Sequence, residues 1–265
     1  MKINKINSAI FSPTGGTRQV VTTIAQNLGN VEKTIIDLTF SGNTANIVCK
    51  DTELTIFGIP VYGGRVPEVA AQRLLAITGN NSPAVVVAVY GNRAFDDALL
   101  ELKNIVEKQG FIVIAGAAFI GEHSFSDASH PIASGRPDAR DIEAANHFAQ
   151  EIQEKITSFS TLSDNITPKI PGNTPHKALM QPNTISPITD NNLCTRCGKC
   201  VEVCPTGAIT LNGKIETDGA KCILCCACVK VCADNARIAE DKLFTMATEK
   251  LFANCKERKE SEFFL

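Results

Sequence analysis

The chain has 265 residues, of which 44% are hydrophobic and 20% are charged, and its formal net charge is −2. This composition is typical of a folded globular protein and excludes a disordered chain. The chain has neither a basic excess nor a helix with a stripe of lysine and arginine, so we expect no binding to nucleic acid. The longest apolar run, residues 111–121, is too short to span a bilayer, and the first residues lack the apolar segment of a signal peptide. We therefore expect a soluble cytoplasmic protein without membrane insertion.

Residues 1–157 alternate between apolar, β-branched runs and segments of helical periodicity. The runs predict strands at 3–11, 34–38, 54–61, 84–90 and 111–120. The helical segments are 17–28, 67–77, 95–108 and 137–156. Continuous apolar runs are typical of strands buried on both faces, and strand–helix alternation predicts right-handed crossovers onto a parallel sheet. We therefore predict an α/β domain with a five-stranded parallel sheet and helices on both faces.

A loop rich in glycine and hydroxyl groups, SPTGGT at residues 12–17, connects the first predicted strand to the first predicted helix. Hydroxyls and glycine amides at a helix N-terminus can converge on one anion. The loop lacks the G-K-[ST] of nucleotide triphosphate loops and the G-x-G-x-x-G of dinucleotide loops. It resembles the [S/T]-x-T-G-x-T phosphate loop of flavodoxins, and an ordinary glycine-rich turn is the alternative. The resemblance implies that the FMN phosphate is held by Ser12, Thr14, Gly15, Gly16 and Thr17.

Two further loops lie where flavodoxins hold the isoalloxazine ring of FMN. The resemblance implies the strand order 2-1-3-4-5, in which the ligand lies beyond the carboxyl ends of the strands. The residues after the third and fourth predicted strands are Tyr62, Gly63, Gly64, Tyr90, Gly91 and Asn92. A tyrosine ring can stack on the flavin, and glycines let the backbone approach its polar edge. We therefore predict that these residues contact FMN, although a tyrosine at a strand end is also common without a flavin.

The loop after the fifth predicted strand lies at the same edge of the sheet and carries Glu122 and His123. Both side chains are candidate proton donors to a reduced flavin or to a bound substrate, and His123 is the candidate catalytic residue. The alternative is that His123 forms a hydrogen bond within its own loop.

Residues 158–189 are rich in proline, serine and threonine, which is typical of a semi-rigid linker. A free linker of this length is unusual in a compact protein. We therefore expect the apolar residues of the linker to lie along the domain interface. These residues are Ile166, Ile170, Leu179, Met180 and Ile185.

Nine of the 11 cysteines lie between residues 194 and 232 and form an internal repeat. Cysteines at 194, 197, 200 and 204 recur 28 positions later, at 222, 225, 228 and 232. The spacing C-x2-C-x2-C-x3-C binds 4Fe–4S clusters in bacterial ferredoxins, where the fourth cysteine binds the other cluster. Zinc knuckles consist of C-x2-C pairs separated by a longer loop, and structural disulfides are unusual in the cytoplasm, so both alternatives are disfavoured.

Residues 190–240 thus resemble a two-cluster ferredoxin domain of small α+β fold. The resemblance implies one cluster with the ligands Cys194, Cys197, Cys200 and Cys232. It implies a second cluster with the ligands Cys222, Cys225, Cys228 and Cys204. The additional Cys226 is interpreted as a small buried residue or as a swapped ligand. The sequence departs from the family at Ala233, where a proline usually follows the last cysteine.

Residues 241–265 are predicted to form a C-terminal helix that docks on a domain. One face of this helix is apolar, and such a face is normally buried. The residues on this face are Leu243, Phe244, Ala247, Leu251 and Phe252.

The whole chain resembles the flavodoxin–ferredoxin fusion proteins of anaerobic bacteria and archaea. The resemblance implies FMN, two 4Fe–4S clusters and electron transfer. Because a cluster passes one electron at a time and a flavin holds one or two, the fusion couples one-electron donors to two-electron chemistry. The first hypothesis is a redox carrier whose partners are redox proteins. The second is an FMN-dependent reductase of a small-molecule acceptor, and the third is a redox-sensing interaction module that uses the spare thiols.

Overall fold

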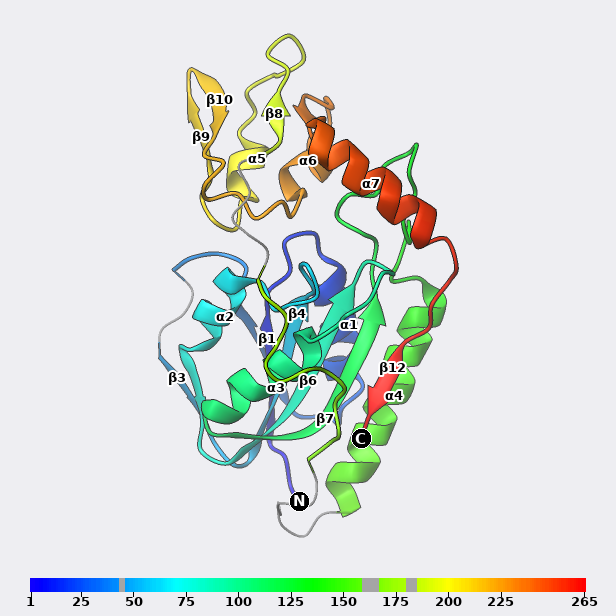
Figure 1. Ribbon diagram of the computed structural model, residues 1–265. Coiled ribbons are helices and arrows are strands. Elements are labelled where there is room, and N and C mark those ends of the chain that lie inside the picture. The colour runs from blue at the N-terminus through cyan, green and yellow to red at the C-terminus, as the bar shows by residue number, and fades with distance from the viewer. Residues whose placement is uncertain (43–45, 159–166, 180–184) are drawn as a thin grey trace.

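The computed structural model describes residues 1–42, 46–158, 167–179 and 185–265. The α/β part, residues 1–158, lies below the cysteine-rich part, residues 185–240, in Figure 1. The C-terminal segment, residues 241–265, leaves the cysteine-rich part and returns along the side of the α/β part. Two predicted linker contacts, Ile166 and Met180, fall outside the described residues.

The central sheet has six strands, of which five are parallel. In spatial order they are β2 (Glu32–Asp37), β1 (Lys5–Ile10), β4 (Glu53–Pro60), β6 (Ser82–Tyr90), β7 (Phe111–Ile120) and the antiparallel β12 (Glu262–Phe264). The parallel strands follow the predicted order 2-1-3-4-5. A separate parallel pair is formed by β3 (Ile47–Cys49) and β5 (Ile77–Gly79). The carboxyl ends of the five parallel strands meet at the edge that faces the cysteine-rich part (Figure 1).

Helices cover both faces of the sheet, as predicted. On one face lie α1 (Gly16–Gln26) and α4 (Ala139–Ser158), and on the other lie α2 (Glu68–Leu74) and α3 (Ala98–Lys108). Every residue of β6 is buried, which explains its continuous apolar sequence. Gly58 of β4 permits the close approach of α1, because a Cβ atom there would lie 2.3 Å from Cγ2 of Val21. Among the described residues, no helix is long and apolar enough to cross a membrane.

The cysteine-rich part contains two pairs of short strands and two one-turn helices. The hairpin of β9 (Ile209–Asn212) and β10 (Lys214–Thr217) turns at Gly213, where φ is 74°. The other elements are β8 (Ile188–Thr189), its partner β11 (Arg237–Ile238), α5 (Lys199–Glu202) and α6 (Ala227–Lys230). The apolar core here is small: Ile209 and Ile215 are buried among cysteines, and Val201, Val203 and Val229 pack against them half-buried. Hydrophobic burial alone therefore stabilises this part only weakly.

The described linker residues 167–179 are bound to the α/β part. Asp97, which is fully buried at the start of α3, accepts hydrogen bonds from the backbone N–H groups of Asn173 at 2.8 Å and Lys177 at 2.6 Å. Ile170 packs against the core of the sheet face that carries α3. Ile170 therefore anchors the linker, whereas Leu179 is 47% exposed.

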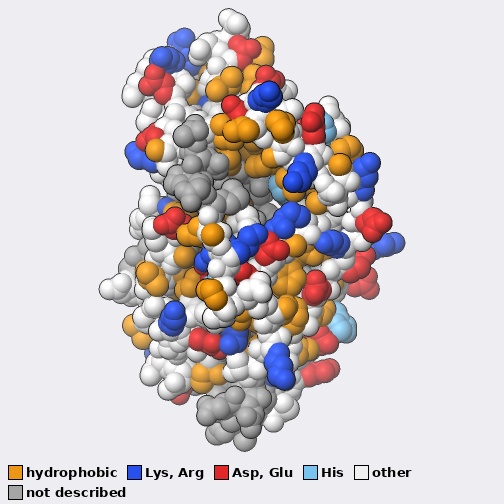
Figure 2. Space-filling view, in the orientation of Figure 1, with side chains coloured by type: hydrophobic (Ala, Val, Ile, Leu, Met, Phe, Trp, Pro, Cys, Tyr) orange, Lys and Arg blue, Asp and Glu red, His pale blue; other side chains and the backbone are white. Residues whose placement is uncertain are grey.

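The C-terminal segment is not the single helix that was predicted. Asp241 caps α7 (Lys242–Asn254) by accepting a hydrogen bond from the Leu243 N–H at 2.8 Å, and the chain then extends into β12. Of the predicted apolar face only Phe244 is fully buried. Figure 2 shows hydrophobic side chains on the upper surface of the molecule, and exposed residues of α7 include Leu243 and Met246. The apolar periodicity of residues 243–252 carries no information about the strand that follows. The strand β12 forms because the edge of β7 has unpaired backbone groups.

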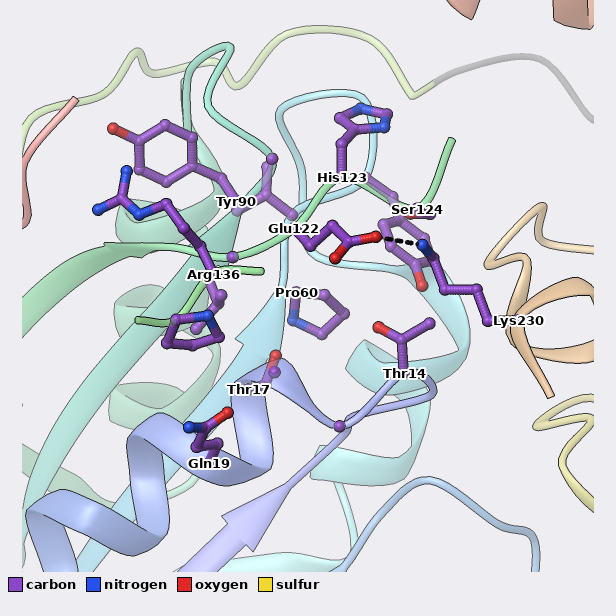
Figure 3. Close-up of a pocket in the computed structure, with 18 residues that line it drawn as sticks. Thr14, Thr17, Gln19, Pro60, Tyr90, Glu122, His123, Ser124, Arg136 and Lys230 are labelled. Atoms are coloured by element: carbon purple, nitrogen blue, oxygen red, sulfur yellow. Dashed lines mark hydrogen bonds and ion pairs between the residues drawn. The ribbon is translucent and has the colours of Figure 1, made fainter. Parts of the chain in front are cut away.

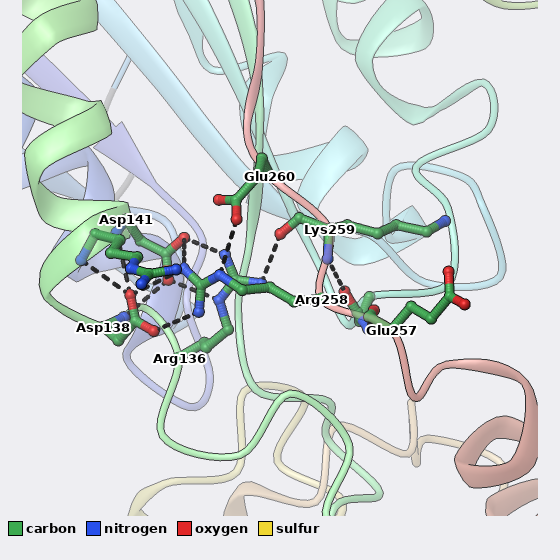
Figure 4. A network of polar contacts seen from close by, with 9 residues as sticks. Arg136, Asp138, Asp141, Glu257, Arg258, Lys259 and Glu260 are labelled. Atoms are coloured by element: carbon green, nitrogen blue, oxygen red, sulfur yellow. Dashed lines mark hydrogen bonds and ion pairs between the residues drawn. The ribbon is translucent and has the colours of Figure 1, made fainter.

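A network of charged groups holds the turn between α7 and β12 (Figure 4). Arg258 forms an ion pair with Asp138 at 2.6 Å, and the carbonyl oxygen of Lys259 accepts a hydrogen bond from Arg136 Nη1 at 2.8 Å. Arg136 also forms a buried ion pair with Asp141 at the start of α4. The tail is therefore attached both by strand pairing and by this network.

Candidate functional site

A cleft of about 330 Å³ lies at the carboxyl ends of the parallel strands (Figure 3). Its walls come from the loops that follow β1, β4, β6 and β7 and from one residue of the cysteine-rich part. The predicted residues that line it are Thr14, Gly15, Gly16, Thr17, Tyr62, Tyr90, Gly91, Glu122 and His123. The predicted residues outside its lining are Ser12, Gly63, Gly64 and Asn92.

The loop at residues 12–17 places the start of α1 at the cleft. Gly15 is the N-cap residue, with φ of 90°, and has no side chain to bind the first-turn N–H groups. Ser12 is buried beneath the loop, where its Oγ accepts a hydrogen bond from the Arg18 N–H at 3.0 Å. Thr14 is exposed at the cleft. The loop therefore presents glycine amides, a hydroxyl and the positive end of a helix dipole to an anion, while Ser12 supports it from below.

The two tyrosines occupy different environments. Tyr90 is 4% exposed and packs against Phe95 in the core, with 5.7 Å between the ring centroids. Burial raises the pKa of Tyr90 to about 12. Tyr62 is half-buried, and burial together with the neighbouring thiols of the cysteine-rich part raises its pKa well above the ordinary value. The predicted stacking role does not fit the Tyr90 ring, which belongs to the core, and Tyr62 is the tyrosine at the junction of the two parts.

Asn92 and Gly64 serve the structure of their loops. Asn92 Nδ2 donates hydrogen bonds to the carbonyl oxygens of Cys255 and Glu257, each at 2.8 Å. The side chain of Asn92 therefore binds the C-terminal segment and does not face the cleft as predicted. Gly64 has φ of 85°, and a Cβ atom there would lie 2.1 Å from Oδ2 of Asp96. The turn therefore requires a glycine at position 64.

His123 lies against Gly91, where a Cβ atom would be only 2.3 Å from Cδ2 of the imidazole. The Phe125 N–H donates a hydrogen bond to His123 Nδ1 at 3.0 Å, which is the contact within the loop that the alternative interpretation expects. Burial, followed by the charges of Lys230 and Arg93, lowers the pKa of His123 to about 4. The imidazole is therefore neutral at pH 7, and its remaining N–H can donate a hydrogen bond without acting as an imidazolium acid.

The cysteine-rich part contributes Lys230 of α6 to the cleft, and sequence analysis missed this residue (Figure 3). Lys230 Nζ lies 2.6 Å from Glu122 Oε1 and 3.3 Å from the carbonyl oxygen of Ser126. Burial alone would raise the pKa of Glu122, but hydrogen bonds from Lys230 and the Gly135 N–H lower it. An ion pair therefore joins the two parts at the mouth of the cleft.

The eight repeat cysteines line two small cavities. One is lined by Cys194, Cys197, Cys200 and Cys232. The other is lined by Cys204, Cys222, Cys225 and Cys228, together with Cys226. All 11 cysteines are free of disulfides. In the part of the chain that is described, no three metal-binding side chains converge on the site of a single ion.

Hydrogen-bond donors point at equivalent thiols in the two copies. The Ala208 N–H donates to Cys204 Sγ at 3.2 Å, and its counterpart, the Ala236 N–H, donates to Cys232 Sγ at 3.3 Å. Such donors stabilise thiolate ligands and orient them. Four thiols around each cavity, with donors directed at them, fit a cubane cluster in each.

Comparisons with known proteins found one family model and several solved structures. A family model described as a 4Fe-4S binding domain matches residues 187–210. Flavodoxin 1 from Bacillus cereus is 16% identical, and the match covers 59% of this chain and 100% of that one with a TM-score of 0.43. A flavodoxin from the domain Archaea is 12% identical, and the match covers 58% of this chain and 99% of that one with a TM-score of 0.39. Rubredoxin oxygen:oxidoreductase from Desulfovibrio gigas is 13% identical, and the match covers 59% of this chain and 36% of that one with a TM-score of 0.39. A search of curated proteins returns no match.

These identities and TM-scores are low, so the assignment of the fold rests on the strand order and the helix arrangement. The chain joins a flavodoxin-like α/β domain to a 4Fe–4S ferredoxin-type region. Flavodoxin-like folds bind flavin at the carboxyl ends of their strands, where the cleft lies. The cleft therefore lies where open α/β sheets bind their ligands, beside a region that matches a 4Fe-4S binding domain.

Proposed function

We propose that this protein relays single electrons between two 4Fe–4S clusters and FMN, and thereby couples one-electron redox proteins to two-electron chemistry. When bound, FMN supplies a carrier of one or two electrons, and each cluster supplies one-electron steps. The observation that carries the proposal is that the cysteine-rich part lies over the cleft and contributes Lys230 to its lining. A cysteine-rich part that is held at the cleft allows electron transfer without dissociation of a complex.

FMN is the flavin that the cleft favours. Thr14, Gly15, Gly16 and Thr17 surround the start of α1, where a terminal phosphate gains hydrogen bonds and the helix dipole. The volume of about 330 Å³ is at the lower end of the range for ligand pockets and suits a mononucleotide. The backbone at Gly91 and the side chain of Tyr62 are the proposed contacts of the ring.

The proposed cluster ligands follow the two cavities. The outer cluster, as we name it, takes Cys194, Cys197, Cys200 and Cys232. The inner cluster takes Cys222, Cys225, Cys228 and Cys204. Because the apolar core of this part is small, the clusters themselves are proposed to hold it together. We place the protein in the cytoplasm, where the thiols stay reduced until clusters form.

An FMN-dependent reductase that acts on a small molecule is the alternative. That activity needs a proton donor beside the flavin, and His123 is the candidate. Its neutral imidazole, with Nδ1 already bound by the Phe125 N–H, disfavours this role at neutral pH. The relay is therefore the favoured function, with redox proteins as partners.

Stopped-flow reduction of the loaded protein tests the relay. Wild-type protein is mixed anaerobically with a ferredoxin-type donor, and the absorbance of clusters and flavin is followed separately. We expect cluster bleaching to precede flavin bleaching, and flavin reduction to slow in Cys200→Ser. Cys49→Ser, a buried cysteine of the α/β part, is the matched control and should behave as wild type. Equally fast flavin reduction in Cys200→Ser would contradict the relay.

A further inference from the structure

The internal repeat allows a comparison of two copies of one loop within the same chain. Positions 28 apart are equivalent, so each residue of the first copy has a counterpart in the second. Residues 195–197, Thr-Arg-Cys, are all exposed. Their counterparts 223–225, Ile-Leu-Cys, are buried or half-buried. Since the two loops share spacing and backbone, the difference arises from what covers the second copy.

The α/β part contacts residues next to the ligands of the second cavity. Ile223 packs against the core of the α/β part, next to the ligand Cys222. Arg73 of α2 donates a hydrogen bond at 2.7 Å to the carbonyl oxygen of Pro205, which follows the ligand Cys204. Lys230, which lies between Cys228 and Cys232, reaches Glu122 at 2.6 Å. The repeat counterparts of Ile223, Pro205 and Lys230 are Thr195, Ala233 and Glu202. Thr195 and Ala233 are exposed, whereas Ile223 is half-buried and Pro205 is buried; Lys230 and Glu202 are both exposed.

Ile223 and Pro205, two of the residues that contact the α/β part, also line the second cavity. Both cavities are lined by residues of the cysteine-rich part, but the lining of the first includes the exposed Thr195 and Arg196, whereas the second has the half-buried Ile223. The ligand Cys197 of the first cavity is exposed, whereas its counterpart Cys225 is 8% exposed.

We propose that the inner cluster faces the flavin and that the outer cluster faces solvent and exchanges electrons with the external redox protein. This order rests on the proposed function and adds direction to it. For each full reduction of the flavin, two molecules of a one-electron donor protein each lose one electron at the outer cluster. Both electrons pass singly through the inner cluster, and solvent supplies the protons.

Flavin fluorescence tests the order without turnover, because quenching by electron transfer to a nearby cluster falls steeply with distance. The test compares two ligand variants at equivalent positions, Cys225→Ser for the inner cluster and Cys197→Ser for the outer cluster. We expect Cys225→Ser to raise the fluorescence of bound FMN several-fold and Cys197→Ser to leave it near the wild-type value. An equal or larger rise in Cys197→Ser would overturn the order.

A second pair of variants keeps all cysteine ligands. It tests the order even if the loss of a ligand unfolds the cysteine-rich part. Ile223→Thr combined with Lys230→Glu gives the second copy the residues of the first. This variant removes the contacts of these two residues with the α/β part and should therefore raise FMN fluorescence. Thr195→Ile combined with Glu202→Lys makes the reverse exchange on the exposed copy and should leave it unchanged. The reverse pattern, or no change in either variant, would refute the proposed order.

Cofactor analysis separates this inference from the proposed function. FMN and iron are measured in every sample. Wild-type protein without FMN or without iron–sulfur clusters refutes the proposed function itself. Wild-type protein with both cofactors, but with fluorescence controlled by the Cys197 site, refutes only the order.

Discussion

At the scale of single residues, burial and one hydrogen bond decide what His123 can do. Its Nδ1 accepts from the Phe125 N–H, and the ring packs edge-on against Phe125, with 5.1 Å between the ring centroids. Protonation would charge a desolvated ring close to Lys230 and Arg93, and it would turn Nδ1 into a donor that faces another donor. The neutral side chain of His123 therefore stabilises the loop that borders the cleft.

This environment predicts an acid-sensitive contribution to stability. The pKa of His123 is about 4 in the native protein, below its ordinary value of 6.5, so the unfolded chain binds the proton first as the pH falls. Above the ordinary value the contribution is constant, and it is lost as the pH falls towards the native pKa. Urea unfolding of wild type and His123→Gln at pH about 7.5 and about 5 measures it. We expect the free energy of unfolding to fall more in wild type than in the variant, and equal losses would contradict the assignment.

At the scale of elements, the C-terminal segment connects the parts of the molecule. Its helix α7 packs Phe244 against Phe125 of the cleft-side loop, with 4.3 Å between ring centroids. Its strand β12 pairs antiparallel with β7 and covers the edge of the sheet. Between them, Asn92 and Arg136 bind the backbone of the tail. The tail therefore ties loops at the cleft to the far edge of the sheet.

The prediction for this element concerns Phe263 of β12. Its ring stacks on Phe148 of α4 at 4.8 Å and lies 5.7 Å from Phe119 of β7. Phe263→Ala removes these contacts from a half-buried site, so we expect the free energy of unfolding to fall by about 2 kcal/mol. Chemical denaturation measures the change. Leu265→Ala, at a neighbouring residue that is 46% exposed, should change it by less than about 0.5 kcal/mol. An equal effect of both variants would show that β12 is not docked through Phe263.

At the scale of the whole molecule, we expect the bound clusters to determine whether the cysteine-rich part is stably folded. We expect anaerobically prepared protein to contain about eight irons per chain, from two cubanes. Cys200→Ala should lose about half of them and destabilise the cysteine-rich part, because its apolar core is small. Iron and acid-labile sulfide assays measure the content, with Cys49→Ala as a control that should retain it. Stoichiometric zinc without sulfide would refute the two-cluster assignment.

Local chemistry and periodicity allowed the α/β class and the shared cysteine sites of the repeat to be predicted, and the resemblance to flavodoxins supplied the strand order. Buried parallel strands require continuous apolar runs, and cysteines that share one cavity must lie close together along a turn. The glycine-rich loop predicted a helix start at Thr17, one residue after the observed start of α1 at Gly16, because a helix begins where such a loop ends. These features depend on neighbours within a few residues or on one regular crossover.

Contacts between distant segments were decided by the tertiary structure alone. Asn92 binds carbonyl oxygens at positions 255 and 257, and Lys230 meets Glu122 across 108 residues. No local pattern encodes such pairs, since each side chain is chemically suited to several roles. The repeat did carry one signal: Thr195 and Glu202 are replaced in the second copy by Ile223 and Lys230, which contact the α/β part. An apolar or oppositely charged residue in one of two equivalent loops is favoured where that loop is covered, but only the fold shows which surface covers it.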